Sequence, residues 1–409
     1  MARINNKFQA LDSSVLDGAG TNYIVQTISG SLYSFHGGLN TSADFFGYQK
    51  STNNGYTWSN TVLIVGSFNF VNAAIWYDRW SGLNSDLIHI VYQDNTSDDV
   101  FYRTLNTSND TLSSPVTIYN GSTTTSNNYV LSITRAKGGN IAIAFNANPN
   151  GTTNEKGLAI SSSVWNVYTG SSLQNPFRNE SSYGQAIILP EQGSSDDQDL
   201  CLIHWDRSTS ILTKQHWDNS ALTWVTSSIS TGMSFQNPNV VFPIMSAVPD
   251  NTNNQNILIA FKSPNLGGNR LQCWTLTSSS ITAKTDVISS AISNQGDCAL
   301  SLDTTSNTWY AYYNGLGNSL GYPGVNLFYK TSTNQGTTWS SEIPLTTDVP
   351  TYMSSSNNNN FGSFKYLVPI PLTSDLNPII FFGEFWSTNY YLFGANLPLF
   401  TDGGSIVVT

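Results

Sequence analysis

The feature that most constrains this chain is a recurrence of short, very apolar segments along its whole length. Seven such segments, each ending in a polar residue, read LYSFH, IHIVYQ, AIAFN, LIHWD, LIAFK, AYYN and FFGE. Their last residues lie 57, 53, 60, 56, 52 and 70 positions apart, at His36, Gln93, Asn146, Asp206, Lys262, Asn314 and Glu384. A recurrence with a period of this size indicates a repeat architecture, in which one supersecondary unit is stacked many times.

The composition of each unit indicates its strand content. A turn rich in Gly, Asn, Asp and Ser and an earlier strand-like run precede each apolar segment, and two more strand-like runs follow it. Four strands in a unit of about 50 residues are typical of a β-propeller blade. We therefore predict an all-β fold, a single β-propeller domain over residues 1–409 with seven four-stranded blades. Six blades plus an irregular sheet are the alternative.

The last unit supplies only three clear strands, around KYLVPI, PIIFF and YYLFG. An exposed strand edge is a liability, and a propeller removes it by closing its ring. We expect an N-terminal strand within residues 1–20 to complete the last blade. Residues 400–409 are expected to form a C-terminal tail.

Composition excludes several classes of function. Only 10% of the residues are charged, with 16 Lys+Arg against 26 Asp+Glu and a net charge of -10, so no basic stripe is available for nucleic acid. No apolar run approaches the roughly 18 residues that membrane insertion requires. The N-terminus shows no recognisable signal peptide. The cysteines, Cys201, Cys273 and Cys298, have unrelated spacings and are interpreted as core residues.

Two octapeptides carry a resemblance to a known family. They read STNNGYTW from Ser51 and STNQGTTW from Ser332, and match the Asp-box pattern S-x-D-x-G-x-T-W with Asn in place of Asp. The chain thereby resembles the sialidase-like, BNR-repeat β-propeller family. The resemblance implies that each box forms the hairpin between the third and fourth strands of a blade, on the face opposite the active site. We interpret the box residues as structural: Ser51, Asn53, Gly55, Thr57, Trp58, Ser332, Asn334, Gly336, Thr338 and Trp339.

The sequence departs from that family where a sialidase needs its chemistry. The resemblance implies three arginines around the substrate carboxylate, a Tyr–Glu nucleophile pair and an Asp acid/base. None of the seven arginines follows Arg270, and the F/Y-R-I/L-P motif is absent, its nearest relic being Phe177-Arg178-Asn179. These departures argue against sialoside hydrolysis, and the enzyme question stays open with a leaning towards no activity.

Another glycan-cleaving chemistry would need only two carboxylates or a His/Tyr pair. Asp94, Asp206 and Glu384 lie at or beside the ends of the recurring segments, so we expect them at one face. Arg207 or Lys262 would serve as an electrostatic partner. The acidic turn Asp196-Asp197-Gln198-Asp199 offers oxygen ligands for calcium but lacks the pattern of an EF-hand loop, so we predict no cofactor.

Aromatic and polar residues at the same strand ends suit a glycan, since rings stack on sugars and amides bond hydroxyls. The predicted ligand-binding residues are Tyr92, Gln93, Asp94, Trp205, Asp206, Arg207, Lys262, Tyr313, Asn314 and Glu384.

The function predicted from these features is a non-enzymatic, lectin-like propeller that binds a glycan or a protein. We expect a receptor-binding or decorating component of a virion, such as that of a phage, or of another extracellular assembly. Its partners would be glycans or a cell-surface receptor and other subunits of the assembly. The alternatives are a glycan-cleaving hydrolase or lyase and a purely architectural subunit.

Overall fold

The computed structural model describes most of the chain in segments. These are residues 24–40, 43–53, 57–66, 70–78, 85–94, 97, 99–121, 131–147, 155–161, 168–169, 178–179, 185–206, 211–225, 229–234, 245–261, 269–292, 298–315, 326–344, 364–369, 379–386 and 389–396. Within these segments the regular elements are all strands, and no helix has the length and hydropathy needed to cross a bilayer. The predicted all-β class is confirmed.

The strands of the described residues form seven sheets, numbered here in chain order. The first three sheets contain β1 (Ile24–Gln26), β2 (Leu32–Asn40), β3 (Ala43–Ser51) and β4 (Val62–Gly66); β5 (Phe70–Tyr77), β6 (Leu87–Asp94), β7 (Val100–Asn106), β8 (Thr111–Leu112), β9 (Val116–Asn120) and β13 (Tyr168–Thr169); and β10 (Leu131–Arg135), β11 (Ile141–Ala147), β12 (Glu155–Ile160) and β14 (Arg178–Asn179).

The fourth and fifth sheets contain β15 (Gln185–Pro190), β16 (Leu200–Asp206), β17 (Ile211–Asp218), β18 (Thr223–Trp224) and β19 (Ile229–Ser234); and β20 (Met245–Asp250), β21 (Gln255–Phe261), β22 (Asn269–Leu276), β23 (Ile281–Ala283) and β24 (Ile288–Ile292). The last two contain β25 (Cys298–Asp303), β26 (Thr308–Gly315), β27 (Asn326–Ser332) and β28 (Ile343–Pro344); and β29 (Phe364–Pro369), β30 (Ile379–Trp386) and β31 (Asn389–Asn396).

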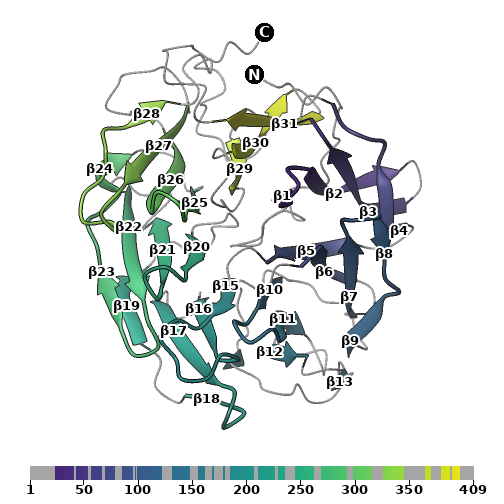
Figure 1. Ribbon diagram of the computed structural model, residues 1–409, viewed down its shortest axis with the longest axis horizontal. Coiled ribbons are helices and arrows are strands. Elements are labelled where there is room, and N and C mark those ends of the chain that lie inside the picture. Colours follow the sequence, from purple (N-terminus) through teal and green to yellow (C-terminus); the bar gives the residue numbers. More distant parts are fainter. Residues whose placement is uncertain are drawn as a thin grey trace.

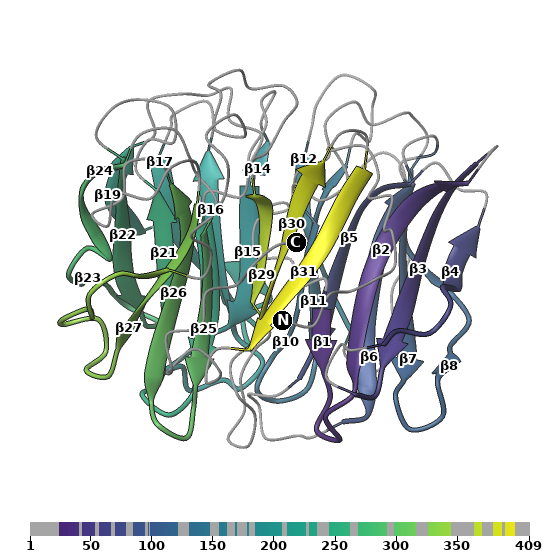
Figure 2. The same cartoon turned by 90° about the horizontal axis from the view of Figure 1, so that it is seen from above.

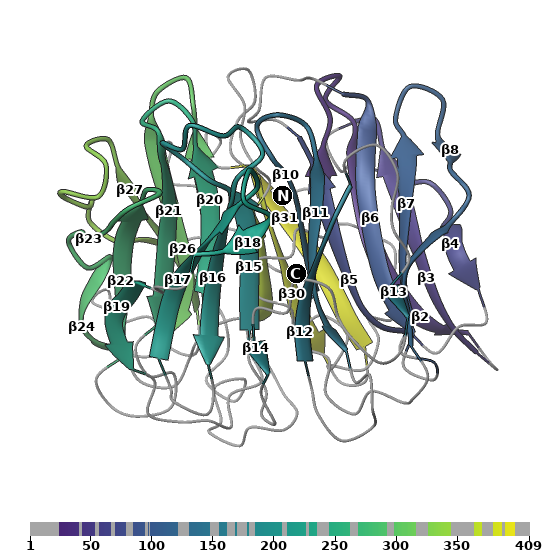
Figure 3. The ribbon, with the colours of Figure 1, turned by 90° about the horizontal axis from the view of Figure 1, so that it is seen from below.

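The sheets follow one another around a common centre, with the first strand of each sheet nearest to it (Figure 1). Seen from the two sides, the strands run roughly parallel to the axis of the molecule (Figures 2 and 3). The long inner strands that follow one another in sequence pair antiparallel, as in a meander, for example β2 with β3 and β6 with β7. The seventh sheet has three strands in the described residues, and residues 1–20 and 400–409 lie outside them.

The outer strand of three sheets is divided into two pieces. In the second, fourth and fifth sheets a short strand near the turn and a longer one beyond it pair with the same third strand, with a register shift in the longer ladder. The second sheet gains a further strand, because β13 pairs parallel with β9 although it lies between β12 and β14 in sequence.

Apolar side chains fill the spaces between consecutive sheets. Phe35 of the first sheet and Ile90 of the second belong to one buried cluster, and Ala144 of the third sheet and Leu202 of the fourth belong to another. Because every strand alternates its side chains between two faces, each inner strand contributes to the cluster on either side. Close packing of this kind positions the strand ends rigidly against one another.

Hydrogen bonds also join consecutive sheets at the end where the first strand turns into the second. The partners are Tyr33 and Asp110 (2.5 Å), Arg135 and Asp78 (3.4 Å), the Asn140 amide and Gln198 (3.0 Å), Gln192 and Asn251 (2.8 Å), and Asn253 and Asn307 (2.9 Å). We call these contacts the turn ties. They link the first sheet through to the sixth.

Candidate functional site

The two ends of the sheets have different roles, and strand register separates them. In the first sheet Leu32, at the start of β2, pairs with Ser51, the first residue of an Asp-box turn, whereas Asn40 pairs with Ala43 at the far end. In the sixth sheet Trp309 pairs with Ser332 in the same way. We call the end with the Asp-box turns the box end, and the end where the second strands finish the site end.

Second strands of neighbouring sheets meet at the site end. Gln93 and Asp94 close β6, and the Gln93 Nε2 donates to the backbone carbonyl of Asn146 at 2.9 Å, across to the third sheet. Gln93 is fully buried, so its amide joins the sheets and is not presented to a ligand. Asp94 is half-buried, and its Oδ1 accepts from the Ser97 amide at 3.4 Å.

The predicted sugar-stacking rings lie in the core. Tyr92 is 2% exposed and packs against Phe101 with ring centroids 5.4 Å apart. Trp205 is also 2% exposed. Tyr313 is fully buried, and its hydroxyl donates to Glu342 at 2.6 Å. The physical reason is alternation: apolar and aromatic residues of an inner strand face the neighbouring sheets, which leaves no open ring for a sugar.

The remaining predicted residues are placed only by their backbone or not at all. Asp206 ends β16, opposite Ile211, and Asn314 lies in β26. Glu384 pairs with Tyr391 within β30. The side chains of these three residues, and all of Arg207 and Lys262, lie outside the described residues.

The Asp-box turns are built by side-chain hydrogen bonds within the turn. In the second turn Asn334 Oδ1 accepts from the Thr338 amide at 2.9 Å and from the Ser332 hydroxyl at 3.0 Å. The Asn334 Nδ2 donates to the Thr338 hydroxyl at 2.8 Å, a contact that a carboxylate would have to accept instead. Trp339 packs beside Trp309 with centroids 6.4 Å apart.

The first turn repeats this geometry through Asn53, whose Oδ1 accepts from the Thr57 amide at 2.9 Å and whose Nδ2 donates to the Thr57 hydroxyl at 2.8 Å. Trp58 is half-buried against the core of the first two sheets. Gly55 lies outside the described residues.

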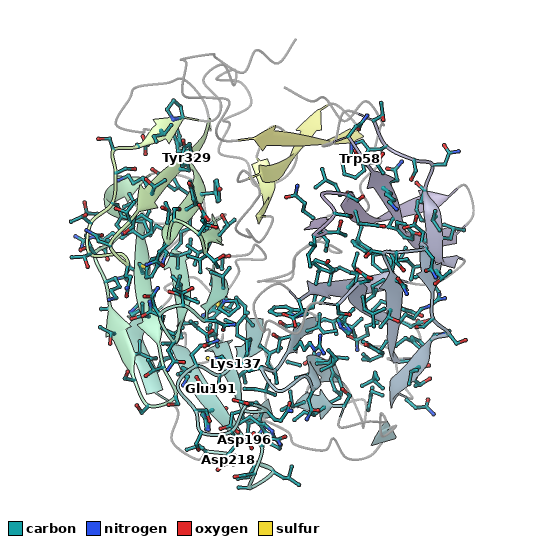
Figure 4. The ribbon with its side chains drawn as sticks, in the orientation of Figure 1. Trp58, Lys137, Glu191, Asp196, Asp218 and Tyr329 are labelled. Atoms are coloured by element: carbon teal, nitrogen blue, oxygen red, sulfur yellow. The ribbon has the colours of Figure 1, made fainter. Side chains whose placement is uncertain are left out.

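A buried charged network that the sequence did not predict lies at the box end of the fourth sheet. Glu191 Oε2 lies 2.8 Å from Lys214 Nζ and 2.9 Å from His216 Nδ1. His216 Nε2 lies 3.4 Å from Asp199, whose carboxylate also accepts from Ser194. Glu191 and Lys214 are almost fully buried. Glu191, Asp196 and Asp218 gather in the same part of the molecule (Figure 4).

This network joins two sheets. Lys214 Nζ also donates to the carbonyls of Thr277 and Ser278, at 2.5 and 3.1 Å, in the β22–β23 turn of the fifth sheet. Three oxygen acceptors around one buried ammonium satisfy its three donors. One feature of the sequence could have predicted the burial of this cation. Two-residue alternation places Lys214 on the same strand face as the core residue Leu212.

Two carboxylates of the acidic turn, residues 196–199, accept hydrogen bonds from backbone amides of the protein. Asp196 Oδ1 accepts from the Gln198 amide at 2.8 Å, and Asp199 Oδ1 accepts from the Asn219 amide at 2.8 Å. In the described part of the chain, no group of three or more His, Cys, Asp or Glu side chains is arranged to hold a metal ion.

The three cysteines are buried and free. Burial raises the pKa of both Cys201 and Cys273 to about 12, so neither thiol is a thiolate near neutral pH. Both side chains are core residues without nucleophilic character.

The fold is similar to that of solved propeller enzymes. A polysaccharide lyase, Uly1, has 9% sequence identity and a TM-score of 0.50, with 96% of this chain and 93% of that chain covered. The Hadza microbial sialidase Hz136 has 12% identity and a TM-score of 0.46 over 93% of this chain and 66% of that one. An α-L-arabinanase of Penicillium chrysogenum has 11% identity and a TM-score of 0.40 over 95% and 96%. No family model and no curated protein matches the sequence.

These comparisons change the reading of the sequence in two ways. The similarity to solved structures concerns the fold alone, through the polysaccharide lyase Uly1, and no family model supports the BNR repeats themselves. The prediction of a non-enzymatic binding propeller is contradicted by the comparison with the polysaccharide lyase Uly1, which favours the alternative, a glycan-cleaving enzyme. The missing sialidase arginines argue against sialoside hydrolysis alone, and a carboxylate-based hydrolase or lyase was the alternative that the sequence left open.

Proposed function

We propose that this protein cleaves glycans as a hydrolase or a lyase, with its active site at the site end of the sheets. The observation that carries the proposal is the fold shared with the polysaccharide lyase Uly1 over nearly the whole length of both chains. Sheet packing fixes the strand ends, which suits a reaction that requires groups held in a defined geometry.

Carboxylates at that end supply the proposed chemistry. Asp94 and Asp206 end second strands of the second and fourth sheets, and Glu384 lies in the second strand of the seventh. In hydrolysis one protonated carboxyl donates to the leaving oxygen while a second carboxylate activates water or attacks the sugar. In elimination a base removes a proton beside the carboxylate of a uronate and an acid protonates the leaving oxygen.

The proposal includes a complete ring. We propose seven blades, with a strand from residues 1–20 closing the last one, because the described residues form seven sheets and the seventh has three strands. An extracellular location or one on a virion surface, where polysaccharides occur, also belongs to the proposal.

The test is a cleavage assay of the full-length protein on a panel of neutral, uronate-containing and sulfated polysaccharides. Mass spectrometry of the products distinguishes addition of water from formation of an unsaturated sugar. We expect at least one of Asp94→Asn, Asp206→Asn and Glu384→Gln to reduce the rate by about 100-fold or more. Asp218→Asn, at the box end, is the matched control and is expected to keep full activity.

Two outcomes would contradict the proposal at different levels. Activity that survives all three amide substitutions would reject these carboxylates as acid and base. A folded protein that leaves the whole panel intact would reject the function.

A further inference from the structure

The strand pairing of the second sheet is irregular at its site end. The β5–β6 ladder is regular as far as the pair Asn72 and Gln93. Its register then shifts, so that Phe70 pairs with Asp94 and Val71 is left over as an extra residue. An extra residue of this kind is a β-bulge, and bulges are over-represented beside active sites, where they bend a strand and re-aim its neighbours.

The irregularity is rare among the corresponding ladders of the described residues. Five of the seven ladders between first and second strands keep one register throughout, namely β1–β2, β10–β11, β15–β16, β20–β21 and β25–β26. The remaining one, β29–β30, shifts between Phe364 and Tyr366, and the backbone of Phe364 pairs there with that of Glu384. Both shifts therefore fall opposite the backbone position of a carboxylate named in the proposed function.

The residue before Asp94 is anchored to the neighbouring sheet. Gln93 is fully buried, and its Nε2 donates to the Asn146 carbonyl of the third sheet at 2.9 Å. Val91, two residues earlier, packs in the buried cluster that joins the second and third sheets. Because a buried carbonyl that loses its partner costs free energy, the contact holds the site ends of β6 and β11 at a fixed separation.

Backbone contacts fix Asp94 from the other side. The Asp94 amide donates to the Asp99 carbonyl at 2.9 Å, which closes the turn from β6 to β7. The Asp94 Oδ1 accepts from the Ser97 amide at 3.4 Å, within the same turn. The Asp99 Oδ1 accepts from the Gly121 amide, just beyond β9, at 2.8 Å. Asp94 is thus held between two anchors, Gln93 before it and Asp99 after it.

The alternation of β6 turns Asp94 away from the third sheet. Because Gln93 faces the third sheet, Asp94 belongs to the face that packs against the first. Tyr92, on that same face, lies against Phe46 of the first sheet with ring centroids 6.2 Å apart. Tyr92 is 2% exposed, whereas Asp94 is half-buried. A carboxylate on a fixed backbone at the edge of a packed core meets the requirement for a pre-organised acid or base.

We propose that Asp94 is the proton-transferring carboxyl of the cleavage reaction and that Gln93 is its positioning residue, acting through the contact with Asn146. This inference rests on the proposed function. Asp94 passes a proton to the leaving oxygen as the glycosidic C–O bond breaks, and regains one from water in hydrolysis or from the sugar ring in elimination. Gln93 is buried and does not touch the substrate, so its effect on the rate is indirect.

Steady-state kinetics of the full-length protein on a cleaved polysaccharide test the two roles. Asp94→Asn should lower kcat about 100-fold or more. Gln93→Met keeps the length of the side chain but removes the donor, and should lower kcat about tenfold or more with KM within about twofold, because a small misplacement of a reacting group is costly. Gln192→Met is the matched control. It removes a buried amide whose Nε2 donates to Asn251 at the box end, and should change neither constant.

A double-variant cycle separates positioning from a general loss of stability. Q93M should not slow D94N any further, because Gln93 acts only through Asp94. A residue with a merely structural role would lower the activity of both backgrounds by the same factor.

Hydrogen exchange examines the same contact without turnover. The Asp94 amide should exchange about tenfold faster in Q93M than in the wild type, and at the wild-type rate in Q192M. An unchanged exchange rate in Q93M would overturn the anchoring of Asp94 by Gln93.

The inference and the proposed function fail in different ways. Cleavage that D94N leaves unaffected, or that Q93M slows equally in both backgrounds, would overturn the roles of these residues and leave the function standing. A folded protein that cleaves none of the polysaccharides would reject the function, and with it the chemistry assigned to Asp94.

Discussion

At the scale of single residues, burial decides how His89 ionises. The ring lies between the second and third sheets, 5% exposed, with its Nδ1 at 2.6 Å from the Tyr102 hydroxyl. Desolvation, assisted by Arg135 and opposed by Asp78, lowers the pKa of His89 from 6.5 to about 4. His89 is therefore neutral in the folded protein at every pH above that value.

This shift predicts acid sensitivity. The unfolded chain binds a proton at His89 near pH 6.5, whereas the folded chain binds it only near pH 4, so acid favours unfolding between these values. The free energy of unfolding falls by about 3 kcal/mol through this one group as the pH falls from 6.5 to about 4. Urea unfolding at about pH 7 and about pH 4.5 should show a smaller pH dependence for His89→Gln than for the wild type. An equal pH dependence of the unfolding free energy in the two proteins would contradict the predicted role of His89.

A second residue-scale prediction concerns the buried ion pair. Lys214→Met leaves the Glu191 carboxylate buried without its ammonium, and we expect a loss of about 3 to 5 kcal/mol in the free energy of unfolding. Adding Glu191→Gln should recover part of that loss, because the uncompensated charge is removed. Chemical denaturation of the two single variants and the double variant measures the coupling, and additive losses would contradict it.

Sequence reasoning found the residues whose environment follows from strand periodicity. Cys201, Cys273 and Cys298 were interpreted as core residues, and all three are buried. The Glu191–Lys214 pair was not predicted, because Glu191 follows one strand and Lys214 lies in another, with the β16 strand between them. A contact of this kind depends on how a turn and a distant strand approach in space, which no local pattern encodes.

At the scale of elements, four of the hairpins between third and fourth strands share one backbone hydrogen bond. In each of these hairpins a backbone amide donates to the carbonyl of the third-strand residue nine positions earlier. The pairs are Ser59 to Lys50, Ser113 to Thr104, Val225 to His216 and Ser340 to Thr331. Only the first and last carry the Asp-box signature in sequence. The others place their positive φ at Asp110 and Leu222, whereas the second Asp-box turn places it at Gln335 and Gly336, so this amide contact forms without the motif and with a different turn.

The glycine of the second Asp-box turn gives a testable contrast. Gly336 has a φ of +73°, and a Cβ there would lie 2.9 Å from the Trp309 ring. Gly30 has a φ of +86° and no atom within 4 Å of a Cβ. Gly30→Ala should lose about 1 kcal/mol to backbone strain alone, whereas Gly336→Ala should lose about 3 kcal/mol because overpacking is added. Equal losses in chemical denaturation would show that the contact with Trp309 is unimportant.

At the scale of the whole molecule, the repeat was readable from sequence and the closure of the ring was not. The spacing of the apolar segments predicted units that the structure shows as successive meander sheets. The proposed strand from residues 1–20 depends on two chain ends meeting, which spacing alone does not determine.

Deletion tests this closure. Removing residues 2–20 should expose the edge of the last blade, lower the unfolding temperature by roughly 5 °C or more and promote self-association. Removing residues 400–409, the predicted tail, is the control and should change neither property. Calorimetry and size-exclusion chromatography report both, and an unaffected N-terminal deletion would contradict the closed ring.

The turn ties also set an order in which the molecule can be built. Gln192 reaches Asn251 and Asn253 reaches Asn307, each partner lying one repeat further along the chain. A growing polypeptide can complete each tie as soon as the next turn leaves the ribosome, before later repeats exist. Synthesis from the N-terminus would thus add finished sheets one at a time, and only the final seam would wait for the whole chain.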